Sequence, residues 1–346
     1  MLILGIESSC DECCAAVIED GRHIRSNGIR SSAAIQERYG GVVPEIVSRQ
    51  HLLAVVPVIK EALNAVQCQL SDVEAIAVTA GPGLIGSLLV GVSAAKALAA
   101  ASGKALVPVH HLAGHVAANY LAHSELKPPF LALLCSGAHS HIIHVKTYTE
   151  YCILARTRDD AAGEAFDKIA REIGLGYPGG PKIDRVSKTG QPDALDLPRT
   201  HFKDSLDFSF SGLKTAVLNK VHQAEQQARR EGRQREDILS TANIAASFQE
   251  AVCRVLIDHL GQIAEQCGEK QIVLAGGVSA NSRLRELAGQ LCEEKKLELY
   301  LPPIELCTDN AAMIGAQGYY EYLAGTRADL RLNPRSQWEL GTALLS

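Results

Sequence analysis

Two histidines four residues apart are the first feature of this chain whose spacing could do chemistry. His111 and His115 lie in the stretch VHHLAGHVAAN, which is typical of a helix, and this separation places both imidazoles on one helix face. That is the geometry of a two-histidine metal site. A metalloprotease helix carries a glutamate directly after its first histidine as general base, and here that position is Leu112. The pair therefore predicts a metal without the usual water-activating base.

The elements that position this histidine pair can be predicted from strand, turn and helix patterns in the sequence. The opening MLILGIESSCDECCAAVIEDG predicts a β-hairpin with its turn at residues 8 to 12, and PFLALLCSGAHSHIIHV repeats the plan. AIAVTAGPGLIGSLLVGVSAAKALAAAS and KQIVLAGGVSANSRLRELAGQL each indicate a strand, a glycine turn and a helix. TDNAAMIGAQGYYEYLAG predicts a late helix that begins near Asp309, with Thr308 or Asp309 as N-cap. The repetition predicts a duplicated α/β chain of two domains with a cleft between the halves.

Composition describes an ordinary globular protein. The 346 residues are 47% hydrophobic and 21% charged, which is enough for two sizeable cores. The only close cysteine cluster, Cys10, Cys13 and Cys14, has no second CxxC to complete a zinc cage, so we expect reduced thiols in a cytosolic protein. No secretion signal and no uninterrupted apolar span near eighteen residues is visible, so we expect a cytoplasmic protein that does not span a membrane.

The net charge of −5 argues against nucleic-acid binding by overall electrostatics. The net charge still allows nucleic-acid binding by a local basic patch. The strongest candidate is ARREGRQRE, which contains Arg229, Arg230, Arg233 and Arg235. A solvated helix end or loop is the alternative interpretation of this charge run.

Three glycine-containing turns could bind phosphate. They are Ser136-Gly137-Ala138, Gly179-Gly180 and Gly276-Gly277. Such turns leave backbone N–H groups free to meet phosphate oxygens, although a single one is commonly structural. Together, in a duplicated α/β chain, they predict a nucleotide in an inter-domain cleft.

Taken together, these motifs closely resemble those of the TsaD family of tRNA threonylcarbamoyladenosine transferases, once called O-sialoglycoprotein endopeptidases. The resemblance covers nearly the full length, in the order LGIESSCDE, GGVVPEIVSRQH, TAGPGLIGSLLVG, PVHHLAGH, LLCSGAHS, DDAAGEAFDKIAREIGLGYPGGP, FSFSGLKTAV, LAGGVSANSRLR and CTDNAAMIGA. It implies the α/β, duplicated actin, sugar kinase and Hsp70-like two-domain fold. We expect residues 1–122 to form the first domain, completed by a C-terminal helix over 309–346, and residues 123–308 to form the second.

The resemblance also implies a set of site residues. Asp309 joins His111 and His115 as third metal ligand, and this set suits iron, which the family favours, or zinc. Without the resemblance, two incidentally aligned histidines would be preferred. Asp11 and Glu12 are candidates for positioning or deprotonating the incoming amine. The implied substrate contacts are Leu134, Cys135, Ser136, Gly137, Ala138, Asp167, Gly180, Asp184 and Asn281.

Three of these residues have side chains or backbones suited to a nucleotide, and the same three have simpler interpretations. Asp167 could accept from ribose hydroxyls, Gly180 permits close backbone approach, and Asn281 offers a donor and an acceptor to an adenylate. A capping Asp, a turn glycine and a turn Asn are the common alternatives. Two positions depart from the family: Cys13 replaces a threonine hydroxyl expected near the phosphates, and Ala138 adds a Cβ that fits only if φ is negative.

The resemblance implies transfer of a threonylcarbamoyl group from threonylcarbamoyl-AMP to N6 of the adenosine 3′ of the tRNA anticodon. Implied partners are tRNA, a shorter paralogous scaffold subunit and a small P-loop ATPase. A metalloprotease, a noncatalytic nucleotide-binding scaffold and a sugar kinase or other ATPase are the alternatives. The missing glutamate after His111 opposes the protease, and the three metal ligands together favour the catalytic member over the scaffold.

Overall fold

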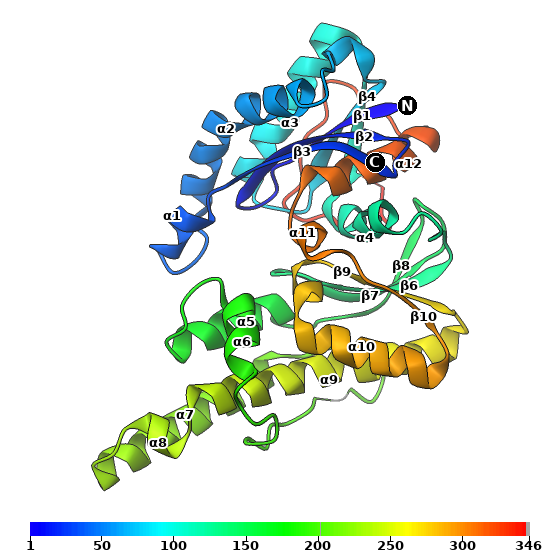
Figure 1. Cartoon of the computed structure of the whole chain (residues 1–346). Helices are drawn as coiled ribbons and strands as arrows, with labels where there is room; N and C mark the ends of the chain where they lie inside the picture. The colour runs from blue at the N-terminus through cyan, green and yellow to red at the C-terminus, as the bar shows by residue number, and fades with distance from the viewer. Residues whose placement is uncertain (201, 344–346) are drawn as a thin grey trace. The chain divides into compact units, whose positions relative to one another are not determined.

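The chain folds into two compact units, each built on a five-stranded sheet (Figure 1). The computed structural model describes residues 1–200 and 202–343. Unit 1 comprises residues 1–130, 144–152 and 302 onward, and unit 2 comprises residues 131–143 and 153–301. The domain limits expected from the sequence stay a prediction.

The sheet of unit 1 has the strand order β3-β2-β1-β4-β5. Its strands are β1 (Leu2–Glu7), β2 (Glu12–Glu19), β3 (His23–Ser31), β4 (Ala75–Gly81) and β5 (Ala105–His110). The first three strands form an antiparallel meander, and β4 and β5 continue the sheet in parallel with β1. The predicted hairpin with its turn at residues 8 to 12 is confirmed. The helices are α1 (Ala33–Glu37), α2 (Pro44–Asn64), η1 (Leu70–Asp72), α3 (Ile85–Ser102), α4 (His111–Ala122), α11 (Ile304–Cys307) and α12 (Ala311–Leu323).

The second sheet repeats this strand order. Its strand order, read from the other edge, is β8-β7-β6-β9-β10. Strands β6, β7 and β8 therefore correspond to β1, β2 and β3, and β9 and β10 correspond to β4 and β5. Its strands are β6 (Phe130–Cys135), β7 (Ser140–Val145), β8 (Tyr151–Arg156), β9 (Gln271–Ala275) and β10 (Glu298–Tyr300). The helices are α5 (Ala162–Glu172), α6 (Gly179–Ser187), α7 (Ser211–Glu231), α8 (Arg235–Ile238), α9 (Thr241–Cys267), η2 (Gly277–Ala280) and α10 (Ser282–Lys295). The matching orders confirm the predicted duplication.

Side-chain alternation gives the sheet of unit 1 two buried faces. Leu4 and Ile6 of β1 pack with residues of α2 and α3, whereas Ile3 packs with residues of α4 and α12. At Gly5 a Cβ atom would lie 2.4 Å from the carbonyl oxygen of Ala311, so only glycine lets α12 approach β1 this closely. The odd-numbered residues of β1 therefore face the helix that follows Asp309.

The late helix is shorter than expected. We expected a C-terminal helix over 309–346 with Thr308 or Asp309 as N-cap, but α12 covers Ala311–Leu323 and its N-cap is Asn310. The side chain of Asn310 accepts a hydrogen bond from the amide of Met313 at 3.0 Å. Residues 324–343 contain no helix and run back over unit 1, where the amide of Arg335 donates to the carbonyl oxygen of Ala80.

One helix, α3, is long and apolar enough to cross a membrane by composition, which the sequence analysis did not anticipate. Within unit 1 it is a packing helix, since Leu88, Val92 and Ala95 belong to the core. Its one charged side chain, Lys96, donates to the carbonyl oxygen of Leu332 at 3.1 Å. The apolar length of α3 is therefore weak evidence for a membrane span.

Candidate metal site and substrate contacts

Helices α4 and α12 bring the predicted metal ligands together in unit 1. Helix α4 begins directly after β5, and its residues 111–120 are all buried. At Gly114 a Cβ atom would lie 2.7 Å from Cδ1 of Ile314, so the missing side chain allows α4 to pack closely on α12. Asp309 lies two residues before α12 and thus reaches the face of α4 that carries His111 and His115.

The three candidate ligands converge on one point. Oδ1 of Asp309 lies 3.1 Å from Nε2 of His115 and 3.5 Å from Nε2 of His111, and one ligand atom from each residue lies within 4.8 Å of the others. His115 is 1% exposed, and neither of its ring nitrogens has a hydrogen bond of acceptable geometry. A buried polar atom without a hydrogen bond is costly, and a metal ion would satisfy it. The residues therefore fit a metal.

A buried carboxylate that the sequence analysis missed stands behind this cluster. Glu7 has no exposed surface, and its Oε2 lies 3.1 Å from Nδ1 of His111. The hydroxyl of Thr79 donates to the same oxygen at 2.6 Å, and the amide of Ser9 donates to Oε1 at 2.5 Å. The strand alternation that turns Ile3 and Gly5 toward α12 also turns Glu7 that way, and this signal could have found it.

The carboxylates change the protonation of the site in the metal-free chain. Burial disfavours a charged His111, but the negative charges of Asp309 and Glu7 outweigh it and raise the pKa of His111 to about 9. Burial likewise opposes the charge on Glu7, yet the neighbouring His111 keeps the pKa of Glu7 below its ordinary value. At neutral pH a proton therefore supplies the positive charge that a metal would bring.

Asp11 and Glu12, the predicted catalytic pair, lie at the end of the first hairpin turn. The carbonyl oxygen of Asp11 accepts from the amide and hydroxyl of Ser32, and Oε1 of Glu12 accepts from the hydroxyl of Ser31 at 2.9 Å. Burial, with the negative charges of Asp11 and Asp309, raises the pKa of Glu12 to about 9. In the metal-free chain Glu12 is therefore protonated at neutral pH.

The end of β6 and the loop after it carry five of the predicted substrate contacts. Leu134 and Cys135 are buried strand residues, so only their backbone could meet a ligand, whereas Gly137 and Ala138 are exposed. The amide of Ser136 donates to the carbonyl oxygen of His139 at 2.7 Å and closes the turn. Among the described residues, Ala138 is not one of the few non-glycine residues with positive φ. Alanine therefore fits this turn without strain.

The remaining predicted contacts hold the helices of unit 2 together. Oδ1 of Asp167 accepts from the amide of Gly179 at the start of α6, and Oδ1 of Asp184 accepts from the amide and hydroxyl of Ser282 at the start of α10. Asn281 is the N-cap of α10. Its Oδ1 accepts from the amide of Leu284, and its Nδ2 donates to Gln249. The carboxylate and amide groups therefore cap helix ends, which is the simpler interpretation expected for Asp167, whereas Asn281 was expected as a turn residue.

Gly180 differs from these neighbours. It lies in the first turn of α6, and a Cβ atom there would meet no heavy atom within 4 Å. The space beside its backbone is open. Of the predicted contacts outside the loop after β6, Gly180 is therefore the position where a ligand could approach the backbone most freely.

The cysteines form no disulfide within the described residues. All ten are free, as expected for reduced cysteines. Cys13 is fully buried in the apolar core of unit 1, and burial raises the pKa of its thiol to about 12. The expected loss of a hydroxyl donor near the phosphates is therefore wrong, since the side chain at this position lies in the core.

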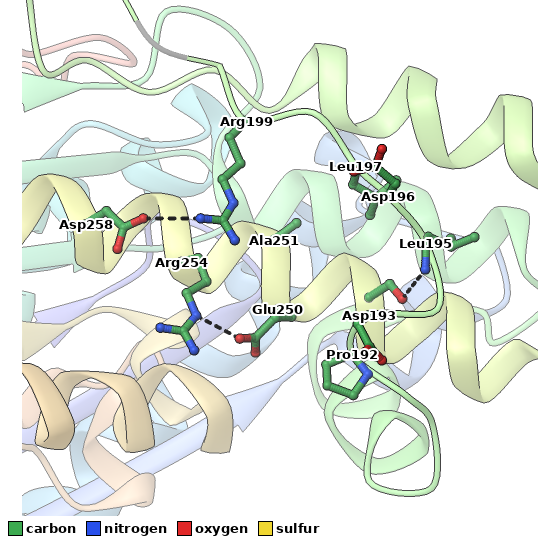
Figure 2. Close-up of a pocket in the computed structure, with 11 residues that line it drawn as sticks. Pro192, Asp193, Leu195, Asp196, Leu197, Arg199, Glu250, Ala251, Arg254 and Asp258 are labelled. Atoms are coloured by element: carbon green, nitrogen blue, oxygen red, sulfur yellow. Dashed lines mark hydrogen bonds and ion pairs between the residues drawn. The ribbon is translucent and has the colours of Figure 1, made fainter.

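A surface hollow in unit 2 lies elsewhere than the predicted contacts (Figure 2). Its volume is about 690 Å³, and it lies between α9 and the loop that contains Pro192 and Leu197. Four of its charged groups form two ion pairs: Arg254 donates to Glu250 at 2.8 Å, and Arg199 lies 3.7 Å from Asp258. None of the predicted site residues lines it. We therefore do not assign the chemistry to this hollow.

Comparison with solved structures supports the fold. Component A of (R)-2-hydroxyglutaryl-CoA dehydratase from Acidaminococcus fermentans matches with a TM-score of 0.52 at 15% identity, covering 93% of this chain and 99% of that chain. Full-length HypF matches with a TM-score of 0.59 at 12% identity, covering 93% of this chain and 46% of that one. At such identities the likeness concerns the fold alone, and it confirms the actin, sugar kinase and Hsp70-like class.

Sequence comparison identifies the family. The sequence model of the TsaD family, described as tRNA N6-adenosine threonylcarbamoyltransferase, matches residues 23–316. Proteins of that name from Clostridium botulinum strain 657 and Clostridium beijerinckii are each 49% identical to this chain, over 340 and 341 residues, and the matches cover 98% of both chains. Since the family match and these relatives span nearly the whole sequence, the chain belongs to the TsaD family, tRNA N6-adenosine threonylcarbamoyltransferase.

Proposed function

We propose that this chain transfers the threonylcarbamoyl group of threonylcarbamoyl-AMP to N6 of the adenosine 3′ of the anticodon in tRNA. The observation that carries the proposal is the full-length similarity to curated tRNA N6-adenosine threonylcarbamoyltransferases, together with the convergence of His111, His115 and Asp309. The N6 amine attacks the carbamoyl carbon and loses a proton, while the bond from that carbon to the phosphate oxygen breaks and AMP leaves. No covalent enzyme intermediate is needed.

His111, His115 and Asp309 would hold one metal ion, iron or zinc, with iron favoured by the family. Two imidazoles and one carboxylate leave coordination positions open. A bound ion would orient and polarise the substrate. Leu112, where a metalloprotease helix carries its general base, is 1% exposed and packs in the interior, which opposes the protease alternative.

Glu12 is our candidate for the group that receives the proton of the N6 amine, with Asp11 beside it. Its carboxyl can accept a proton only when its pKa falls below the working pH. Burial is the largest cause of its raised pKa of about 9, and the negative charges of Asp11 and Asp309 add to it, so neutralising Asp309 lowers the pKa of Glu12. The proposed base therefore depends on the charge state of the metal site.

The proposed adenylate contacts are backbone groups and helix ends of unit 2. The exposed turn at Gly137 and Ala138 and the first turn of α6 at Gly180 offer N–H groups, and helix N-termini favour anions. Asp167 supports the start of α6 through its hydrogen bond, and Asp184 and Asn281 support the start of α10. In this proposal their main contribution is to fix the backbone that meets the nucleotide.

We place the contact with a shorter paralogous subunit on helices α2 and α3, which pack side by side (Figure 1). Leu52, Leu53 and Val56 of α2 are more than half exposed, and Ile85 and Leu89 of α3 are each 47% exposed. Exposed apolar side chains gathered on neighbouring helices mark protein interfaces. We expect Leu53→Asp to abolish copurification of the paralogue without lowering the melting temperature of this chain. The small P-loop ATPase is a further proposed partner, and the cytoplasm is the proposed location.

The experiment that tests the function supplies this chain to a reconstituted system that lacks only the transferase. The other components make threonylcarbamoyl-AMP and present tRNA, and mass spectrometry of the digested nucleosides measures threonylcarbamoyladenosine. The modified nucleoside should appear with the wild-type chain and not with His115→Ala. A scaffold would leave the product absent with both chains, and that result would overturn the proposal.

A further inference from the structure

A buried carboxylate is held in a fixed orientation behind one of the two ligand histidines. Glu7 is the last residue of β1, and both of its oxygens accept hydrogen bonds from neighbouring segments. The amide of Ser9 fixes Oε1, and the hydroxyl of Thr79 on β4 fixes Oε2. With no exposed surface, Glu7 cannot turn toward solvent. Its remaining neighbour is the imidazole of His111.

His111 turns its two ring nitrogens toward different groups. Nε2 faces Oδ1 of Asp309 at 3.5 Å, whereas Nδ1 lies 3.1 Å from Oε2 of Glu7 and also 3.1 Å from the hydroxyl oxygen of Ser9. A neutral imidazole carries one ring proton, so a proton on Nδ1 leaves the lone pair of Nε2 for a metal. Nδ1 of His115 has no hydrogen-bond partner among the described residues, so only His111 is anchored in this way.

We propose that Glu7 is a positioning residue that accepts the Nδ1–H of His111 and so presents Nε2 to the metal. A hydrogen bond to a charged acceptor is roughly twice as strong as one to a neutral acceptor, so Glu7 and not the equidistant Ser9 hydroxyl sets the ring proton. Such outer carboxylates orient histidine ligands and raise their basicity. The inference rests on the proposed function, because it needs a metal at His111, but it concerns a residue outside the ligand set.

A purely structural role for Glu7 is the competing explanation, since Glu7 also ties β1 to β4 through Thr79. Three variants separate the two roles. Glu7→Gln keeps the size and removes the charge, Ser9→Ala removes the other group beside Nδ1, and Thr79→Val removes a buried hydrogen bond to the same carboxylate oxygen. Circular dichroism and thermal melting report the structural cost of each.

The decisive measurement is the affinity for Co²⁺ and Zn²⁺ by competition with a chelator, which needs no transferase activity. Glu7→Gln should weaken the affinity about 10–100-fold, and Ser9→Ala and Thr79→Val should change it by less than about threefold. Equal affinity in wild type and Glu7→Gln, or a larger loss in Ser9→Ala, overturns the role of Glu7. A wild-type chain that binds neither ion refutes the metal site of the proposed function, and the role of Glu7 falls with it.

A second measurement is made on the wild-type chain and does not need Glu7→Gln, so it stands even if that variant does not fold. Long-range proton–nitrogen NMR of the Zn²⁺-loaded chain with labelled histidine reports which ring nitrogen carries the proton, and His111→Gln assigns the signal. His111 should be protonated at Nδ1 and bound through Nε2. Ligation through Nδ1, or a proton on Nε2, overturns the proposal.

Discussion

The predicted residues of unit 1 and those of unit 2 differ in how far the protein already uses their polar atoms. The ring nitrogens of His115 make no hydrogen bond, and its Nε2 lies beside Asp309 in a buried cluster. In unit 2, by contrast, Asn281 bonds both Leu284 and Gln249. The polar atoms of His115 are not used by the fold, whereas those of Asn281 maintain it. Substitutions should therefore separate binding from stability in unit 1 and couple them in unit 2.

We expect the largest effect from replacing a metal ligand of unit 1, which tests whether binding can be lost there without loss of stability. His115→Ala should lower metal content and transferase activity by at least about 100-fold, since even an outer-shell partner is worth 10–100-fold. Metal analysis and nucleoside mass spectrometry measure the two losses. His259 is a matched control, because it is also 1% exposed and lies in unit 2 with its Nδ1 beside the carbonyl oxygen of Leu206. His259→Ala should reduce the melting temperature and leave the metal bound, and loss of metal in both variants would remove the contrast.

A pH titration sharpens the same contrast without a mutation. Because Asp309 and Glu7 raise the pKa of His111 to about 9, a metal that binds at neutral pH must displace a proton. Metal affinity should fall about tenfold for each pH unit below 9. Calorimetry in buffers of different ionisation enthalpy should show close to one proton released at pH 7.5. An affinity that does not change between pH 8 and pH 6 would contradict the assignment.

The stability of the metal-free chain should change in the same pH range. A histidine pKa raised in the folded state stabilises the fold fully below the ordinary value of 6.5, and this contribution is lost as the pH rises to about 9. Chemical unfolding of the metal-free chain across that range measures the loss. His111→Gln should flatten the profile.

The sequence predicted the metal cluster better than its surroundings, for a physical reason. Helical spacing suggested His111 and His115, because a helix fixes which side chains share a face, and the resemblance was needed to prefer a metal site over chance alignment. Asp309 lies far away in the chain and came only from the resemblance. Glu7 was missed although strand alternation placed it on the correct face, because a lone carboxylate at the end of a strand does not indicate which helix covers it.

The fold was predictable wherever local patterns decide it. The hairpin of β1 and β2 and the strand, turn and helix units of β4 and β9 were confirmed, because apolar runs and glycine turns are local signals. The end of α12 could not be predicted in this way, because residues 324–343 are held by contacts with distant segments such as β4. The sequence also could not show that Asn281 and Asp184 would be used as caps, since both capping and ligand contact suit the same polar groups.

An intermediate effect tests the coupling expected in unit 2. Asn281→Ala removes the N-cap of α10 and the partner of Gln249, so unfolding should become easier by about 1–2 kcal/mol and adenine nucleotide should bind about 3–10-fold more weakly. Ser240, the N-cap of α9, is the matched control, and Ser240→Ala should cost similar stability without affecting the nucleotide. In contrast to Ser240→Ala, Gly180→Ala should weaken nucleotide binding without lowering stability. Unchanged nucleotide affinity in Asn281→Ala and Gly180→Ala would show that the pocket is misplaced.

The arginine cluster shows the same contrast, because two of its side chains have hydrogen-bond partners in the protein and two have none within the described residues. Arg233 donates to the carbonyl oxygen of Asp237 at 2.9 Å, and Arg235 donates to the hydroxyl of Thr241 at 2.7 Å. Arg229 and Arg230 are exposed in the last turn of α7, and their side chains make no hydrogen bond or ion pair within the described part of the chain. The sequence interpretation treated all four as one basic patch, but the structure commits two of them to the junction of α7, α8 and α9.

The smallest expected effect therefore compares two double variants in tRNA binding. In a chain of net charge −5, attraction to tRNA has to be local, and cations without protein partners are the ones that can replace counterions on phosphates. Arg229→Gln with Arg230→Gln should weaken tRNA binding about 2–4-fold at low salt, reduce the slope of affinity against salt, and leave adenine nucleotide affinity and melting temperature unchanged. Arg233→Gln with Arg235→Gln should lower the melting temperature and change the salt slope less. Binding over a salt series decides between them, because a slope that is identical in wild type and the first double variant would mean that Arg229 and Arg230 only balance the negative end of the α7 helix dipole.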